Sequence, residues 1–156
     1  MAKRKDKINY YLDIAQTVAQ RATCLRRKFG AIIVSENDEI IATGYNGAAR
    51  GCRDCIERGI CKRKELNVPA GERYELCVSV HAEQNAIISA SRKDMVGGTL
   101  YLVGIDAETG KVLDAAEPCM LCRRFILNSG ISTVVMRNGK GYKIQEVSIW
   151  RTLENL

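Results

Sequence analysis

This 156-residue sequence has no long apolar run, whereas a membrane-spanning helix needs about 18 or more consecutive apolar residues. Its basic start at residues 1–5 is followed by Asp6, Lys7 and Asn9, where a signal peptide would have its apolar stretch. It also has no internal repeat and no low-complexity tract. We therefore expect one domain over residues 1–156, in the cytoplasm and without a membrane partner.

The seven cysteines stand out in an otherwise ordinary composition. Their odd number, the chain length and the missing signal peptide favour metal ligation over a secreted disulfide scaffold. The formal net charge is +6 with every thiol counted as neutral. Six thiolates around two zinc ions would lower that charge to about +4. Charge alone therefore does not identify a nucleic acid as the target.

Hydrophobic periodicity predicts the order of helices and strands. The predicted helices cover residues 7–21, 81–91, 119–127 and 144–153. The predicted strands cover residues 30–34, 39–44, 98–103 and 133–136, the first two as a hairpin. Strands that alternate with helices indicate an α/β domain with a partly parallel sheet. Residues 45–77 show little periodicity and contain four cysteines, so we expect a metal to order this segment.

Two short motifs contain the residue types that a hydrolytic zinc site needs. His81, Cys119 and Cys122 offer three protein ligands and leave a fourth position for water. Pro118 suits the start of a helix, where unpaired N–H groups favour the thiolate forms of the two cysteines. Glu83 lies two residues after His81, so it can act as a proton shuttle beside the metal. Together the motifs match the H-x-E…P-C-x-x-C signature of zinc nucleobase deaminases.

The longer stretches at residues 80–88 and 43–47 resemble the deoxycytidylate deaminase branch of the cytidine deaminase superfamily, over about residues 8 to 136. The resemblance implies a central five-stranded mixed sheet between helices and a homo-oligomer whose subunit contacts complete the active sites. It also implies that Asn46 contacts the sugar and that the Ala82 backbone N–H helps to read the base. In this chemistry an activated water attacks C4 of cytosine, and Glu83 moves protons to N3 and the leaving amine.

Five further cysteines lie outside the catalytic motif, one more than a tetrahedral all-cysteine site requires. The resemblance implies a second, structural zinc held by Cys24, Cys55, Cys61 and Cys77, with Cys52 outside the set. The alternative is that these are free or buried thiols. A structural zinc here would connect the end of the first helix to the irregular segment.

The chain departs from the family pattern in two places. Residues 104–116 form an unusually long route to Pro118, as a lid or as a small hairpin around Thr109 and Gly110, and Ala49 stands where proline is usual. Glu117 before Pro118 is reminiscent of tRNA adenosine deaminases, so an RNA or purine deaminase is the alternative enzyme. A zinc-stabilised nucleic-acid-binding module is the alternative from another class, because basic residues surround the cysteines.

We expect a free cytosine nucleotide, deoxycytidine monophosphate, as the substrate, and no nucleic-acid partner. Arg26, Arg27 and Arg50 lie near the motif-bearing segments, so one or more of them is a candidate for the 5′-phosphate. The sequence leaves open the base modification, the oligomer number and a nucleotide effector.

Overall fold

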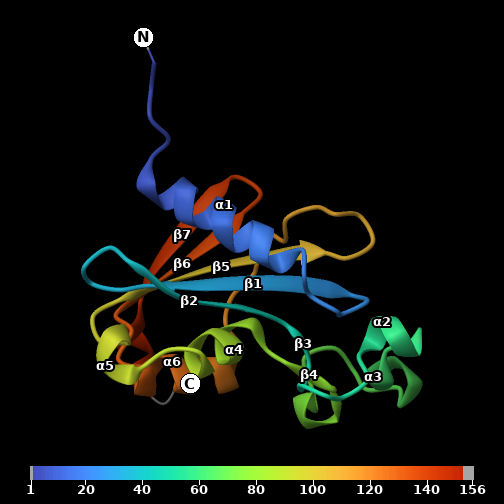
Figure 1. Cartoon of the computed structure of the whole chain (residues 1–156). Coiled ribbons are helices and arrows are strands. Elements are labelled where there is room, and N and C mark those ends of the chain that lie inside the picture. Colours follow the sequence, from blue (N-terminus) through green and yellow to red (C-terminus); the bar gives the residue numbers. More distant parts are fainter. Residues whose placement is uncertain (1, 153–156) are drawn as a thin grey trace.

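A five-stranded mixed sheet with the strand order β2-β1-β5-β6-β7 forms the centre of the structure (Figure 1). The computed structural model describes residues 2–152. Strands β5 and β6 are parallel, and the other neighbouring pairs are antiparallel. The strands are β1 Arg27–Val34, β2 Ile40–Tyr45, β5 Thr99–Asp106, β6 Thr133–Asn138 and β7 Gly141–Glu146.

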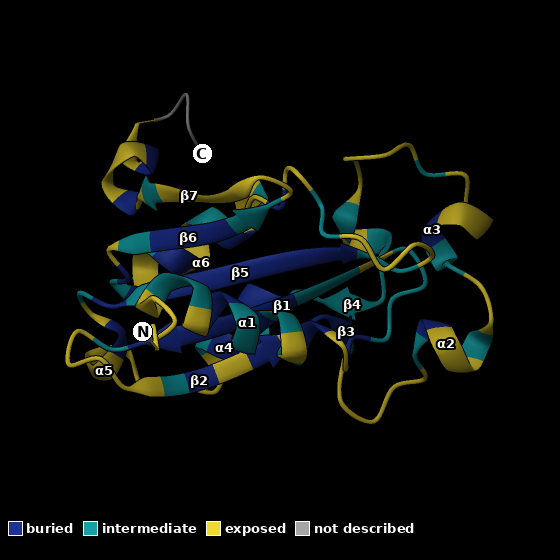
Figure 2. Cartoon of the chain, turned by 90° about the horizontal axis from the view of Figure 1, so that it is seen from above, coloured by how far each residue is buried: buried dark blue, intermediate teal, exposed yellow. Residues whose placement is uncertain are grey.

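Helices cover both faces of this sheet, and each face has its own apolar cluster. Helix α1 (Lys7–Ala19) packs on one face, where it buries Leu12 and Ala15. Helices α4 (Ala82–Ile88) and α6 (Met120–Ser129) pack on the opposite face (Figure 1). Figure 2 shows β5 buried between the layers, whereas the edge strand β7 is exposed along most of its length. The predicted α/β fold with a five-stranded sheet between helices is confirmed.

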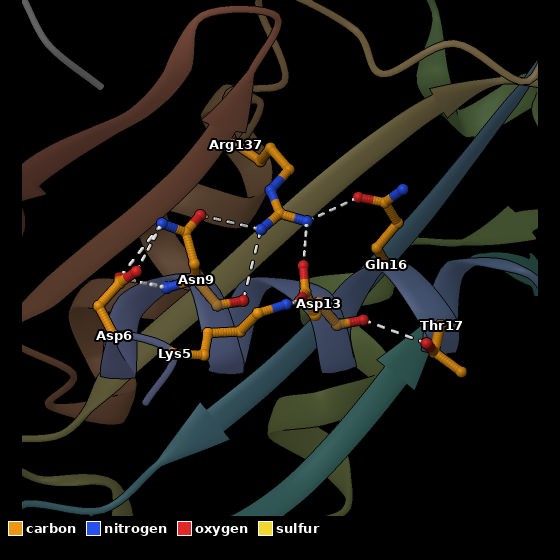
Figure 3. A network of polar contacts seen from close by, with 7 residues as sticks. All are labelled: Lys5, Asp6, Asn9, Asp13, Gln16, Thr17 and Arg137. Carbon is orange, nitrogen blue, oxygen red and sulfur yellow. Dashed lines mark hydrogen bonds and ion pairs between the residues drawn. The ribbon is translucent and has the colours of Figure 1, made fainter. Parts of the chain in front are cut away.

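Polar contacts fix α1 to strand β6 of the sheet (Figure 3). The Arg137 guanidinium on β6 pairs with Asp13 at 2.8 Å and donates to the Gln16 side chain at 2.8 Å. It also donates to the Asn9 side chain at 3.1 Å. At the start of α1, the Asp6 carboxylate accepts a hydrogen bond from the Asn9 backbone N–H, so the helix has a side-chain N-cap.

The cysteine-rich segment lies beyond one end of the sheet, where short elements replace regular structure (Figure 1). Strands β3 (Gly47–Ala48) and β4 (Ser79–Val80) pair with each other at its base. Between them lie the one-turn helices α2 (Cys55–Arg58) and α3 (Lys62–Glu65) and the 3₁₀ turn η1 (Tyr74–Leu76). The low periodicity of this segment in the sequence agrees with that structure.

The predicted helix over residues 144–153 is wrong. Residues 141–146 form strand β7, in which Ile144 pairs with Val135 of β6, and a 3₁₀ helix η2 (Val147–Arg151) follows. Position 153 lies outside the described residues. The predicted helix over 81–91 ends at Ile88, and a separate turn, α5 (Arg92–Met95), follows it. Apolar spacing misled the prediction, because a hairpin partner and not local periodicity decides the structure of an edge strand.

The long route from β5 to Pro118 contains a small hairpin, as the sequence suggested. The Asp106 carboxylate accepts hydrogen bonds from the backbone N–H groups of Glu108 and Thr109, both at 2.9 Å. Gly110 then turns the chain with a φ of 74°, and Val112 returns to bridge Ile105. Within residues 2–152 no helix has the length and apolar content needed to cross a bilayer.

Candidate metal centre and active-site cavity

His81 and Glu83 lie at the start of α4, which the sheet and its neighbours hold in place. The His81 backbone N–H donates to the Gln84 side chain at 2.9 Å. The Asn85 side chain donates to the backbone carbonyl of Tyr45 at 2.8 Å, which connects α4 to the end of β2. Glu83 is buried, with 5% of its surface exposed. The first turn of α4 therefore has a fixed position and keeps a carboxyl group away from bulk water.

Cys119 and Cys122 lie at the start of α6 and face His81. Cys119 is the N-cap residue of α6, and Cys122 is fully buried in its first turn. Their sulfur atoms lie 3.5 Å and 3.3 Å from Nδ1 of His81. A tetrahedral zinc ion with ordinary Zn–N and Zn–S bond lengths would separate these atoms by about 3.6 Å. The three side chains therefore fit a zinc ion.

In this cluster the pKa of one thiol is lowered, and the pKa of the buried carboxyl group beside it is raised. A hydrogen bond from Cys122, and after it one from His81, lowers the pKa of Cys119 to about 4. The hydrogen bond with Cys119 raises the pKa of His81. Burial raises the pKa of Glu83, because desolvation penalises its charged form. A carboxyl group with a raised pKa is suited to accept and return protons near neutral pH.

A cavity of about 210 Å³ opens beside these three side chains. Among the residues predicted for the site, its lining includes Cys24, Arg26, Arg27, Asn46, Cys61, Cys77, His81, Ala82, Glu83 and Cys119. Arg50 is exposed and is not part of this lining. The structure thus brings most of the predicted substrate-binding residues to one cavity, but not Arg50.

Asn46 is buried and already makes two hydrogen bonds to the β1 backbone. Its side-chain oxygen accepts from the Phe29 N–H at 2.7 Å, and its Nδ2 donates to the Arg27 carbonyl at 3.0 Å. The amide keeps one N–H and one lone pair for another partner. Asn46 therefore holds the start of β1 in addition to lining the cavity.

Of the four cysteines predicted for a second metal, Cys24, Cys61 and Cys77 line the cavity, and Cys55 lies close enough to interact with their charges. Cys24 accepts hydrogen bonds from the backbone N–H groups of Arg26 and Arg27, and Cys77 accepts one from Ser79. Burial, and after it the neighbouring charges of Cys24, Cys61 and Cys77, raises the pKa of Cys55. Within residues 2–152, however, only His81, Cys119 and Cys122 place their ligand atoms all within 4.8 Å of one another. Cys52 is exposed.

Two residues of the cavity wall, Arg63 and Tyr74, were missed by the sequence analysis as parts of the site. In the sequence Arg63 is one of the several basic residues around the cysteines, and Lys62 and Lys64 beside it have the same charge. The structure buries Arg63 and leaves Lys64 exposed. No local pattern in a four-residue helix distinguishes the two.

The description of a known protein family fits this arrangement. The family model for the cytidine and deoxycytidylate deaminase zinc-binding region matches residues 5–138, a range that contains both motifs and the three clustered side chains. The chain belongs to the cytidine and deoxycytidylate deaminase family. Membership agrees with the resemblance seen in the sequence and with a zinc ion as the metal.

Several relatives of this chain are deoxycytidylate deaminases. That of Mycobacterium phage D29 is 38% identical over 137 residues, which are 85% of this chain and 94% of the relative. That of Schizosaccharomyces pombe is 35% identical over 127 residues, and there the match spans only 35% of the relative's length. The solved structure of cyanophage S-TIM5 dCMP deaminase in complex with dCMP and dUMP has a TM-score of 0.56 and 26% identity. That comparison covers 87% of this chain and 85% of the phage chain.

Proposed function

We propose that this chain, as one domain over residues 1–156, catalyses the zinc-dependent hydrolytic deamination of dCMP to dUMP with release of ammonia. The observation that carries this proposal is the cluster of His81, Cys119 and Cys122 beside the buried Glu83. The names of the phage and yeast relatives, and the nucleotides in the S-TIM5 complex, support the choice of substrate.

The chemistry divides between the metal and Glu83. When bound by His81, Cys119 and Cys122, zinc supplies the Lewis acidity that prepares a water molecule for attack on C4 of cytosine. Glu83 accepts the first proton of that water and passes it to N3 while the water oxygen bonds to C4. It then takes the second proton from the new hydroxyl group on C4 and passes it to the amino group. The C4–N bond breaks, so dCMP and water give dUMP and ammonia. The pKa of Glu83 is raised by burial, which suits a group that is protonated and deprotonated within one cycle.

The cavity lining supports assignments for the rest of the nucleotide. The Ala82 backbone N–H, at the start of α4, helps to read the base, and the remaining N–H or lone pair of Asn46 contacts the sugar. Arg26 and Arg27 hold the 5′-phosphate through charge-assisted hydrogen bonds. Because Arg50 lies outside the lining, the proposal for the phosphate rests on these two arginines.

An ammonia-release assay tests this proposal. If the phosphate contacts matter, kcat/KM for dCMP should exceed that for deoxycytidine by at least about tenfold, equivalent to about 1.4 kcal/mol. Equal rates on both, or faster release from an adenosine nucleotide or tRNA, would contradict the assigned substrate. Adding nucleoside triphosphates to the same assay tests for the nucleotide effector that the sequence leaves open.

We also propose a second, structural zinc ion held by Cys24, Cys55, Cys61 and Cys77. Three backbone N–H groups donate to two of these sulfur atoms, which stabilises thiolates. Elemental analysis should find two zinc ions per chain, of which Cys122→Ser removes one and Cys55→Ser the other, while Cys52→Ser keeps both. One zinc ion per chain in the active wild-type protein would contradict this second site.

We further propose that the chain is a homo-oligomer in the cytoplasm. Helices α4 and α6 pack together and expose Ile88, Met120, Leu121 and Phe125, an apolar surface beside Cys119 that suits a second copy of the chain. The seven cysteines, all within residues 2–152, form no disulfide, as a reducing compartment requires. Light scattering should detect an oligomer that Phe125→Glu dissociates, whereas a wild-type monomer would contradict the proposal.

A further inference from the structure

Arg63 is a buried cation in the cavity wall that lacks an acidic partner among the described residues. It is 8% exposed, and none of the ion pairs within residues 2–152 includes it. Its Nη2 donates to the backbone carbonyls of Pro69 at 2.8 Å and Glu72 at 2.6 Å. Its Nε is buried without a hydrogen-bond partner in this part of the chain. An apolar residue would avoid this desolvation cost, so stability alone does not explain an arginine here.

The same guanidinium lies over the Tyr74 ring, and Tyr74 contacts His81. The Arg63 guanidinium carbon lies 5.2 Å from the centroid of the Tyr74 ring, within the range of a cation–π contact. The Tyr74 ring meets the His81 imidazole edge to face, with 5.8 Å between centroids and an interplanar angle of 87°. Arg63, Tyr74 and His81 all line the cavity. A continuous line of contacts therefore runs from Arg63 to the candidate metal ligand.

The two carbonyl acceptors belong to the loop that leads to Tyr74. Residues 66–73 connect α3 to η1. Arg63 contacts this loop at Pro69 and Glu72, and its guanidinium carbon lies over the ring of Tyr74, which follows the loop. A planar guanidinium can donate in its plane and stack on an aromatic face at the same time. An ammonium group has no such face, so lysine would keep the charge without this combined geometry.

We propose that Arg63 is a positioning residue that holds the loop over residues 66–73 closed as a wall of the active-site cavity and presses Tyr74 against His81. This inference rests on the proposed function, in which His81 is a zinc ligand. Partners that orient a ligand's side chain change metal affinity or activity by about 10–100-fold when they are removed. Loss of Arg63 should therefore affect the zinc at His81 and the binding of dCMP together.

Zinc release to a chromogenic chelator, measured well below the melting temperature, tests this role. Two zinc ions per chain should leave in two phases. The phase that disappears in Cys122→Ser belongs to the site that contains His81. Arg63→Met and Tyr74→Leu should each accelerate that phase by about tenfold and raise KM for dCMP more than they lower kcat. Tyr74→Phe should behave as wild type, because the ring and not the hydroxyl makes both contacts. Arg63→Lys should not restore slow release.

The matched control is Lys64→Met, which removes the neighbouring charge from the exposed side of α3 and should change neither measurement. The double variant Arg63→Met/Tyr74→Leu should release zinc no faster than the faster single variant, because both substitutions break one line of contacts. If Arg63→Met does not fold, the same role is tested by comparing zinc release from Tyr74→Leu with release from Tyr74→Phe.

Three results would overturn the inference: unchanged release from the His81 site, acceleration confined to the phase that persists in Cys122→Ser, or additive effects in the double variant. Failure of the proposed function itself would look different. In that case the wild-type protein would not bind zinc at His81 or would not deaminate dCMP.

Discussion

Gly44 on β2 lies directly against the backbone of α4, the helix that begins beside His81 and contains Glu83. A Cβ atom at this position would lie 2.3 Å from the Ala82 carbonyl oxygen and 2.4 Å from the Ala86 nitrogen. Non-bonded heavy atoms prefer separations of about 3.5 Å or more, so Gly44→Ala must move α4 away from the sheet by about 1 Å. The neighbouring atoms are backbone, so no side-chain rotation can make the space.

That displacement should affect catalysis more than stability. Overpacking of this kind costs about 1–3 kcal/mol of the free energy of unfolding. A misplacement of about 1 Å in a catalytic arrangement can lower turnover by about 10²-fold. Gly44→Ala should therefore remain largely folded at 25 °C yet lose about two orders of magnitude in kcat, measured by ammonia release per folded molecule.

Gly30→Ala is the matched control, because its Cβ would lie 2.0 Å from the Ala15 carbonyl oxygen and 2.5 Å from the Ala19 nitrogen on α1. Helix α1 covers the opposite face of the sheet, away from the metal cluster. Urea unfolding should show a comparable stability loss in both variants, with near-normal kcat in Gly30→Ala only. Equal kcat in the two variants would refute the argument that the position of α4 against the sheet determines the catalytic geometry.

Three further outcomes follow from named contacts. Glu83→Gln should lower kcat by about 10²–10⁴-fold while elemental analysis finds the catalytic zinc retained, and near-normal turnover would exclude Glu83 as the proton shuttle. Arg137→Ala should lower the free energy of unfolding in urea by about 2 kcal/mol, because it removes the ion pair with Asp13 and two side-chain hydrogen bonds, and an unchanged midpoint would contradict this. The hydrogen bond to Asp38 raises the pKa of Tyr11 to about 12, so its stabilisation is complete below pH 10 and is lost as pH rises toward 12. Thermal melts of Tyr11→Phe should lack that alkaline loss, and parallel wild-type and variant curves would refute it.

The sequence predicted the sheet core and the metal cluster because both depend on short patterns. Strand β5 is buried on both faces and reads as a continuous apolar run, and the cluster comes from two motifs of three and five residues. Each motif lies at the start of a helix, so local capping preferences place its side chains together on one side. The fold then only has to bring the first turns of α4 and α6 together.

The errors occur where contacts distant in sequence decide the structure. Strand β7 has mostly exposed side chains, and only its pairing with β6 makes residues 141–146 a strand. Arg50 and Arg63 are both basic residues near cysteines, yet the structure leaves Arg50 exposed and buries Arg63 in the cavity wall. Burial depends on the carbonyl groups of Pro69 and Glu72, whose positions no local pattern encodes.

The site therefore combines two parts of the chain that are held in different ways. His81, Glu83 and the two cysteines belong to helices packed on the sheet, where close contacts such as that at Gly44 resist displacement. The opposite wall comes from short elements between β3 and β4, which Arg63 connects through backbone carbonyls and an aromatic ring. Deamination requires fixed distances at the metal, whereas in our proposal the wall contributes to zinc retention and to the binding of dCMP. Substitutions under α4 should therefore act mainly on kcat, and substitutions around Arg63 mainly on KM and zinc retention.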